Sequence, residues 1–123
     1  TDGARALTER PELKAAGTRT AAYSDIDYNG HVNNARYIQW IQDMLDEAVL
    51  DTANHFRLDI NYLAEIRPQE TISLWKRPLA IQEYETEEAP LFTPFEVSTC
   101  WAFEGKHIDS GQCSFRAELR CGA

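Results

Sequence analysis

The segment DIDYNGHVNNARYIQW, residues 25–40, decides the fold because a polar loop changes there into an apolar helix. An asparagine at position 33 or 34 can cap this helix, since its side-chain oxygen accepts from a free backbone N–H in the first turn. Apolar side chains then recur at the spacing of one helix face. They are Tyr37, Ile38, Trp40, Ile41, Met44, Leu45, Ala48 and Val49. The sequence therefore predicts one helix of about four turns, buried over more than half its circumference.

The rest of the chain has the two-residue periodicity of β-strands. A short strand at residues 18–23 precedes the helix, and residues 55–63 alternate directly after it. Residues 70–85 form a strand that Pro78 interrupts or bends, and residues 95–119 form two strands around a connection at residues 104–111. The acidic stretch at residues 85–94 reads as a loop. This order predicts an α+β fold in which a curved antiparallel sheet wraps a long central helix.

Length, composition and charge indicate one ordinary globular domain. The chain has 123 residues, of which 43% are hydrophobic and 26% charged. Residues 1–17 have no sustained period, so we expect a linker or tether there and the folded domain at residues 18–123. The net charge of −8 argues against nucleic-acid binding, and no apolar run is long enough to span a membrane.

The cysteines favour a reducing compartment. Cys100, Cys113 and Cys121 lack CxxC spacing, and no Cys/His cluster has the spacing of zinc ligands. The polar start of the chain also lacks the apolar region of a signal peptide. We therefore expect reduced thiols, a cytoplasmic location, and neither a metal nor an organic cofactor. The sequence also allows a disulfide between Cys100 and Cys113 across a hairpin.

A polar constellation stands just before the helix. Asp27, Asn29 and His31 alternate, so in an extended segment they project to one side. The helix start offers free N–H groups that can hold an oxyanion, and carboxylate, amide and imidazole together suit acyl transfer. The alternative is structural, because such residues commonly form turns and caps, and Gly30 permits a tight turn. The residues alone leave both interpretations open.

The stretch SDIDYNGHVNNARYIQW resembles the signature of the acyl-acyl-carrier-protein thioesterases of plants and bacteria, which are hotdog-fold enzymes. In a second match, INYLAEIRPQETISL, Glu65 takes the position of the family's glutamate and Ile66 stands where a cysteine often lies. The resemblance implies that Asp27, Asn29, His31 and Glu65 are catalytic. Without a cysteine nucleophile, it implies attack by a positioned water or by Asp27 itself. Further candidate substrate-binding residues are Gly30, Val32, Tyr37 and Trp40. The alternative for Tyr37 and Trp40 is that they only pack in the core.

The resemblance implies hydrolysis of fatty acyl-acyl-carrier-protein thioesters to free fatty acids, with acyl carrier protein as the partner. Such enzymes usually hold two hotdog halves in one chain, so we expect either the C-terminal half of a longer enzyme or a homo-oligomer. The alternatives are an acyl-CoA thioesterase of the single-hotdog type, a hydratase or dehydratase, and a non-catalytic acyl-binding module. His55 and His107 lie near apparent loops and are predicted to be solvated.

Overall fold

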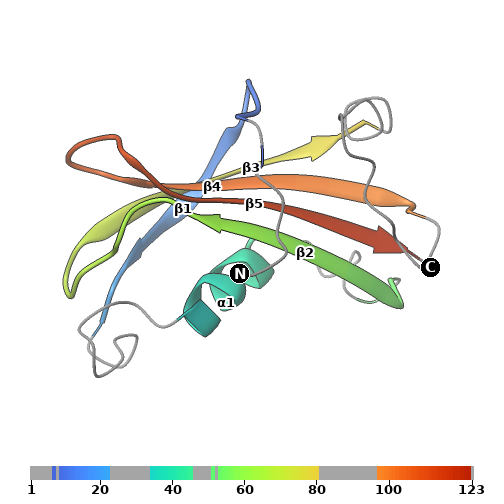
Figure 1. The fold of residues 1–123 in the computed structure, drawn as a ribbon, viewed down its shortest axis with the longest axis horizontal. Helices are drawn as coiled ribbons and strands as arrows, with labels where there is room; N and C mark the ends of the chain where they lie inside the picture. Colours follow the sequence, from blue (N-terminus) through green and yellow to red (C-terminus); the bar gives the residue numbers. More distant parts are fainter. Residues whose placement is uncertain are drawn as a thin grey trace.

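The computed structural model of the protein describes residues 7, 9–22, 34–45, 51, 53–80 and 97–122. Within these ranges five strands form one antiparallel sheet in the order β1-β3-β4-β5-β2, and one helix lies against one face of it (Figure 1). The elements are β1 Lys14–Thr20, α1 Asn34–Asp43, β2 His55–Tyr62, β3 Thr71–Leu79, β4 Thr99–His107 and β5 Cys113–Gly122. The succession of a strand, a helix and four antiparallel strands confirms the predicted α+β hotdog arrangement.

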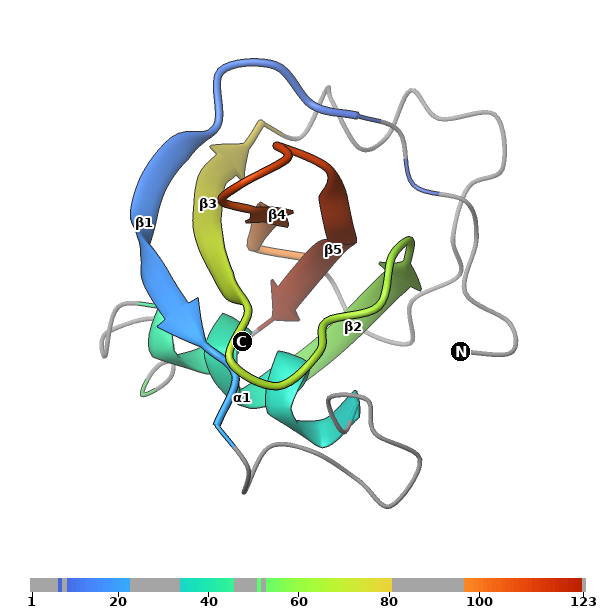
Figure 2. The same cartoon turned by 90° about the vertical axis from the view of Figure 1, so that its left-hand side faces the viewer.

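The sheet curves around α1, as the view along it shows (Figure 2). The helix buries Tyr37, Trp40 and Ile41 against side chains from the inner faces of the strands, and Met44, directly after its end, is buried with them. The predicted apolar face is too wide, however, because Ile38 remains 39% exposed. The inner-face residues of the core are Ile60, Ile72, Leu74, Phe103, Phe115, Ala117, Leu119 and Cys121.

The helix ends earlier than predicted. α1 stops at Asp43, and the amides of Met44 and Leu45 bond back only three residues, to Ile41 O and Gln42 O at 3.1 Å each. Such short bonds tighten and close the last turn of a helix. The predicted continuation to Val49 is therefore wrong at residues 44 and 45, and residues 46–50 lie outside the described ranges.

Several strand boundaries also differ from the prediction, most clearly in β1 and β4. β1 begins at Lys14, which pairs with Lys76, so the expected tether ends inside this strand rather than before it. An irregularity between Ala15 and Gly17 interrupts its regular alternation, which explains why the sequence hides it. β4 continues to His107, three residues past the start of the expected connection.

Pro78 remains within β3 because it lies beyond the last pair with β1, Lys14 with Lys76. At that point β4 is the only neighbouring strand in the described sheet, through the pair of Pro78 with Trp101. A proline without an amide hydrogen is tolerated at such an edge position.

The outer face of the sheet is crossed by residues 7 and 9–13, here called the crossing segment. The Leu7 amide donates to Asn61 Oδ1 of β2 at 2.6 Å, and Arg10 Nε donates to Glu118 Oε2 of β5 at 3.1 Å. Leu13 packs against a small outer cluster from β3 and β4. The segment thus passes over the sheet from the β2 edge to β1.

Buried charges lie beneath the crossing segment. Glu118 is fully buried, and it faces both Arg10 and Arg120, whose Nη2 lies 3.6 Å from Glu118 Oε1. Arg120 also lies 3.5 Å from Asp59 Oδ2. Each buried carboxylate therefore has a cationic partner, as buried charges require. Among the described residues, no helix is long and apolar enough to cross a membrane.

Candidate functional site

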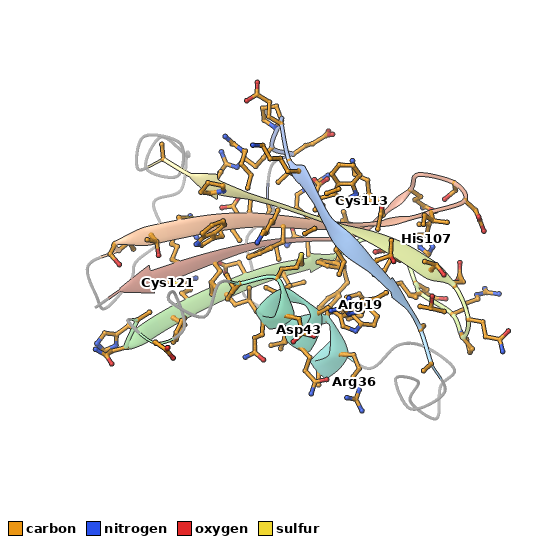
Figure 3. All side chains as sticks on the ribbon, turned by 180° about the vertical axis from the view of Figure 1, so that it is seen from behind. Arg19, Arg36, Asp43, His107, Cys113 and Cys121 are labelled. Atoms are coloured by element: carbon orange, nitrogen blue, oxygen red, sulfur yellow. The ribbon has the colours of Figure 1, made fainter. Side chains whose placement is uncertain are left out.

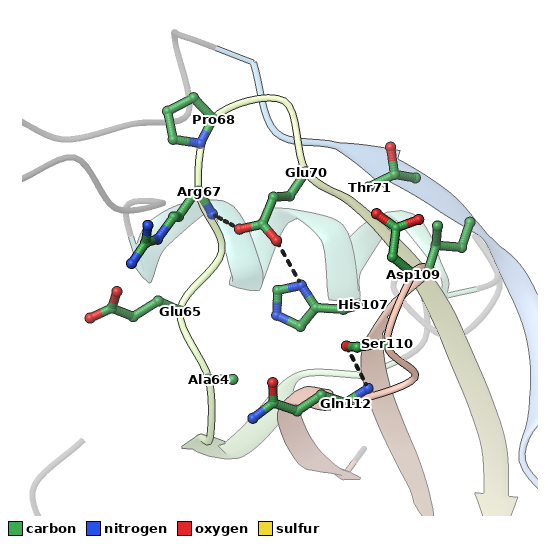
Figure 4. A pocket seen from close by; sticks show the side chains of 11 residues that line it. Ala64, Glu65, Arg67, Pro68, Glu70, Thr71, His107, Asp109, Ser110 and Gln112 are labelled. Carbon is green, nitrogen blue, oxygen red and sulfur yellow. Dashed lines mark hydrogen bonds and ion pairs between the residues drawn. The ribbon is translucent and has the colours of Figure 1, made fainter.

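An open pocket of about 700 Å³ lies at one end of the sheet, between the β2–β3 loop and the β4–β5 turn (Figure 4). His107 marks this end, whereas Cys121 lies toward the opposite end (Figure 3). The lining residues are Ala64, Glu65, Arg67, Pro68, Glu70, Thr71, His107, Ile108, Asp109, Ser110 and Gln112. The pocket is therefore built mainly from polar and charged side chains, and predicted site residue Glu65 is one of them.

The first part of the β2–β3 loop is fixed to the sheet and positions Glu65. The amides of Leu63 and Ala64 both donate to Ser114 O, at 2.9 and 3.1 Å. The Ile66 side chain is fully buried in the core. Glu65 lies between these two anchors and is exposed at the pocket. Ile66 therefore packs in the core, at the position where the thioesterases of the signature often have a cysteine.

The second part of the loop is a tight turn closed twice by Glu70. Pro68 suits the second position of a type II turn, and Gln69, with a φ of 69°, has the backbone conformation of its third position. The Glu70 amide donates to Arg67 O at 3.1 Å, and Glu70 Oε1 accepts from the Arg67 amide at 2.7 Å. One residue thus closes the turn with both its backbone and its side chain.

Glu70 also meets His107, which the sequence prediction placed wrongly in a solvated loop. His107 is 8% exposed, and its Nδ1 lies 3.2 Å from Glu70 Oε2. The imidazole lies at the pocket wall (Figure 4). The alternation of Trp101, Phe103, Gly105 and His107 along β4 is a signal that could have placed it on the inner face. Nothing in the sequence around Glu70 distinguishes that residue.

The predicted residues Asp27, Asn29, Gly30, His31 and Val32 lie outside the described ranges. The described chain just before them is held near the pocket. Ala21 exchanges backbone hydrogen bonds with the turn, donating to Glu70 O at 2.9 Å and accepting from the Gln69 amide at 2.8 Å. On the other side, α1 begins at Asn34.

Tyr37 connects the start of α1 to the loop of Glu65. Its ring makes edge contacts with Trp40, Tyr62 and Phe115, at centroid distances of 5.5, 5.2 and 5.3 Å. Burial raises the pKa of Tyr37 to about 12, and the charges of Tyr62 and Glu65 act in the same direction. The Tyr37 phenol therefore stays neutral near pH 7, and the Glu65 carboxylate is close enough to act on it.

Tyr37 and Trp40 were also predicted as substrate-binding residues. They are 4% and 6% exposed, belong to the core cluster and do not line the described pocket. Their position explains a packing role, and a role in substrate binding stays a prediction.

The described residues offer acid–base chemistry but no metal ligand set. Glu65, Glu70 and His107 supply two carboxylates and an imidazole at one pocket. No group of three metal-ligating side chains occurs in the described part of the chain. All three cysteines are free, and the register places Cys100 opposite Arg120 and Cys113 opposite Lys106. The disulfide between Cys100 and Cys113 that the sequence allowed is therefore not formed.

This chain is similar to known proteins in both sequence and fold. The family model of the acyl-ACP thioesterase C-terminal domain matches residues 9–116. The chloroplastic acyl-[acyl-carrier-protein] hydrolase FATB2 of Cuphea viscosissima is 37% identical over 67 residues, which are 52% of this chain and 16% of that protein.

Two solved structures have the same fold. An acyl-ACP thioesterase from Bacteroides thetaiotaomicron is 25% identical with a TM-score of 0.62, over 94% of this chain and 42% of that one. The 12:0-ACP thioesterase from Umbellularia californica is 14% identical with a TM-score of 0.67, over 98% of this chain and 40% of that one. The chain thus spans less than half the length of these relatives.

Proposed function

Since this chain belongs to the acyl-ACP thioesterase C-terminal domain family, we propose that it is the catalytic domain of an enzyme that hydrolyses fatty acyl-acyl-carrier-protein thioesters to free fatty acids. Acyl carrier protein is the partner that presents the substrate, and the reaction belongs to fatty acid biosynthesis. The observation that supports this most is the family match over residues 9–116, together with Glu65 standing at a pocket beside the residues that flank the signature.

Asp27, Asn29, His31 and Glu65 are the proposed catalytic residues, and water is the second reactant. Asn29 and the backbone N–H groups at the start of α1 hold the thioester oxygen as negative charge develops on it. His31 and Glu65 position and deprotonate the water, whose oxygen attacks the carbonyl carbon. Asp27 orients this assembly through hydrogen bonds. The carbon–sulfur bond then breaks, and the thiol of the carrier leaves with a proton. In the alternative, the Asp27 carboxylate itself attacks the carbonyl and forms an acyl anhydride, which the water hydrolyses to the free acid after the thiol has left. Gly30 and Val32 are proposed to contact the substrate beside these groups.

The fixed position of Glu65 supports this assignment. Its loop is held on Ser114 O and on the buried Ile66, so the backbone that carries the carboxylate has a defined place at the pocket. Its charge acts on Tyr37, which is one turn into the helix that follows the signature. A catalytic base needs such a defined place, because proton transfer depends on geometry first.

We further propose that a second hotdog domain, from the same chain or from another copy, completes the working unit. An apolar groove of about 270 Å³ lies between α1 and β2, which is an edge strand of the described sheet. Ile38 and Phe56 line it and are 39% and 48% exposed. A partner domain against this edge would bury both side chains. Free, largely buried thiols at Cys100 and Cys121 support a reducing, cytoplasmic location.

The test uses the longest natural chain that contains this sequence. Hydrolysis of one acyl group is compared on acyl carrier protein and on CoA, and we expect the carrier-protein thioester to be preferred. Asp27→Asn should lower kcat by about 10²- to 10⁴-fold with the fold intact. The matched control is Asp43→Asn, at an exposed carboxylate whose pair with Arg19 spans 3.5 Å, and it should retain the full rate.

Near-normal turnover in Asp27→Asn would refute the catalytic assignment. A preference for CoA would favour a single-hotdog acyl-CoA enzyme instead. Tight binding of the acyl thioester without turnover would favour a non-catalytic module.

A further inference from the structure

We propose that His107 is a positioning residue of this site, which acts through Glu70 to hold the loop that carries Glu65. The inference rests on the proposed function, in which Glu65 acts on water. It concerns a pair of residues, one on β4 and one on the β2–β3 loop, that meet at the pocket wall through Nδ1 and Oε2 at 3.2 Å.

His107 is itself fixed by its backbone. Its amide donates to Gln112 O at 2.8 Å, and its carbonyl accepts from the Gly111 amide at 2.8 Å. Its strand position opposite Ile72 directs the side chain to the inner face, where it is 8% exposed. A side chain held this way in a strand is a rigid point of attachment.

Glu70 connects His107 to the loop. One of its carboxylate oxygens faces His107, and the other accepts from the Arg67 amide at 2.7 Å. A carboxylate that bonds the backbone of its own turn and a side chain of the sheet ties the two together. The imidazole fits this role in either protonation state, because an Nδ1 hydrogen can donate to the carboxylate in both.

Glu65 lies between this tie and the other anchors of the loop. On one side Leu63 and Ala64 are bonded to Ser114, and on the other side the Arg67–Glu70 turn is bonded to His107 and Ala21. Loss of the His107 contact removes one of the bonds that hold the turn, whereas the bonds to Ala21 and to Ser114 remain. We therefore expect the loop to remain folded while the Glu65 carboxylate loses its defined position.

The test is steady-state hydrolysis of an acyl-carrier-protein thioester by the longest natural chain, in five variants. His107→Leu should lower kcat about 10- to 100-fold with little change in KM, because a displacement of about 1 Å of a catalytic group has effects of this size. His107→Asn should restore most of the rate, since its amide nitrogen takes the place of Nδ1. Glu70→Ala also removes the bond to the Arg67 amide, so it should lower kcat at least as much as His107→Leu. The double variant should be no slower than Glu70→Ala alone, since the two residues act as one unit. His55→Leu, an exposed histidine at the other end of β2, should have the wild-type rate.

A second measurement does not depend on activity. Amide hydrogen exchange in His107→Leu should be faster at Arg67 and Gln69, and unchanged at Leu63 and Ala64. Unchanged exchange at Arg67 and Gln69, or a wild-type kcat in His107→Leu, would overturn the inference. An unsubstituted enzyme without hydrolysis would instead refute the proposed function, and the exchange result would still decide whether His107 anchors the turn.

Discussion

Gly105 of β4 provides a sharp test of the packing that supports the site, through the change Gly105→Ala. A Cβ at this position would overlap Cε1 of Phe115 and lie 2.8 Å from its Cδ1, where ordinary contacts are 3.4–4 Å. Phe115 is the strand partner of Gly105, is fully buried and packs edge-on against Tyr37. The ring therefore has no free space to move into, and the added methyl group must displace it.

The expected magnitude is the difference between two opposing effects. Overpacking a well-filled core costs about 1–3 kcal/mol, and we expect the upper part of this range because the contact is with a rigid ring. Replacing glycine by alanine within a strand otherwise gains about 0.5–1 kcal/mol through the unfolded state. The free energy of unfolding should therefore fall by roughly 2 kcal/mol on balance.

The assay is urea unfolding of the folded chain followed by tryptophan fluorescence. Phe115→Leu should be destabilising alone, but it also opens the space that the added methyl group needs. We expect the double variant to be more stable than the sum of the single effects by at least about 1 kcal/mol. A Gly105→Ala protein as stable as the wild type, or strictly additive effects, would refute the reasoning.

Two further predictions follow from buried ionisable groups. Because the pKa of Tyr37 is raised from 10.0 to about 12, the unfolded chain releases this proton first, and stability should be lost as the pH rises from about 10 to 12. Between about pH 9 and pH 11.5, the free energy of unfolding of Tyr37→Phe, measured by urea titration, should fall by up to about 2 kcal/mol less than that of the unsubstituted protein. Equal falls in the two proteins would contradict this. Burial likewise raises the pKa of Cys100 to about 12 and also raises the pKa values of Cys113 and Cys121. In the folded protein half-buried Cys113 should therefore react first with a thiol reagent at about pH 8, as peptide mass spectrometry would detect, whereas early labelling of Cys100 would contradict the burial argument.

The fold was predictable because its strongest signals are periodic. The spacing of Tyr37, Trp40, Ile41 and Met44 identified the buried face of α1, and the alternation of residues 55–63 identified β2. β1 was partly missed because its irregularity between Ala15 and Gly17 breaks the alternation. Periodicity also cannot show where a helix ends, so the tightening after Asp43 was missed.

The candidate site was predictable only in part. Glu65 was found from a resemblance, and the structure adds its pocket and its anchors. Glu70 and His107 lie far apart in the sequence and meet only through the pairing of β3 with β4, so no local pattern relates them. The roles of Asp27, Asn29 and His31 stay predictions, since these residues lie outside the described ranges.

The route of the crossing segment determines how mechanical load would reach this domain. Leu7 is bonded over β2 at one edge of the sheet, Arg10 over β5, and β1 forms the opposite edge. A pull applied ahead of Leu7 would therefore act first on the β2 edge and on the ion pair of Arg10 with Glu118, before any force reached the hydrogen bonds of β1. The same geometry means that a domain joined ahead of Leu7 would start beside the Asn61 end of β2, with no long connection needed to reach that edge.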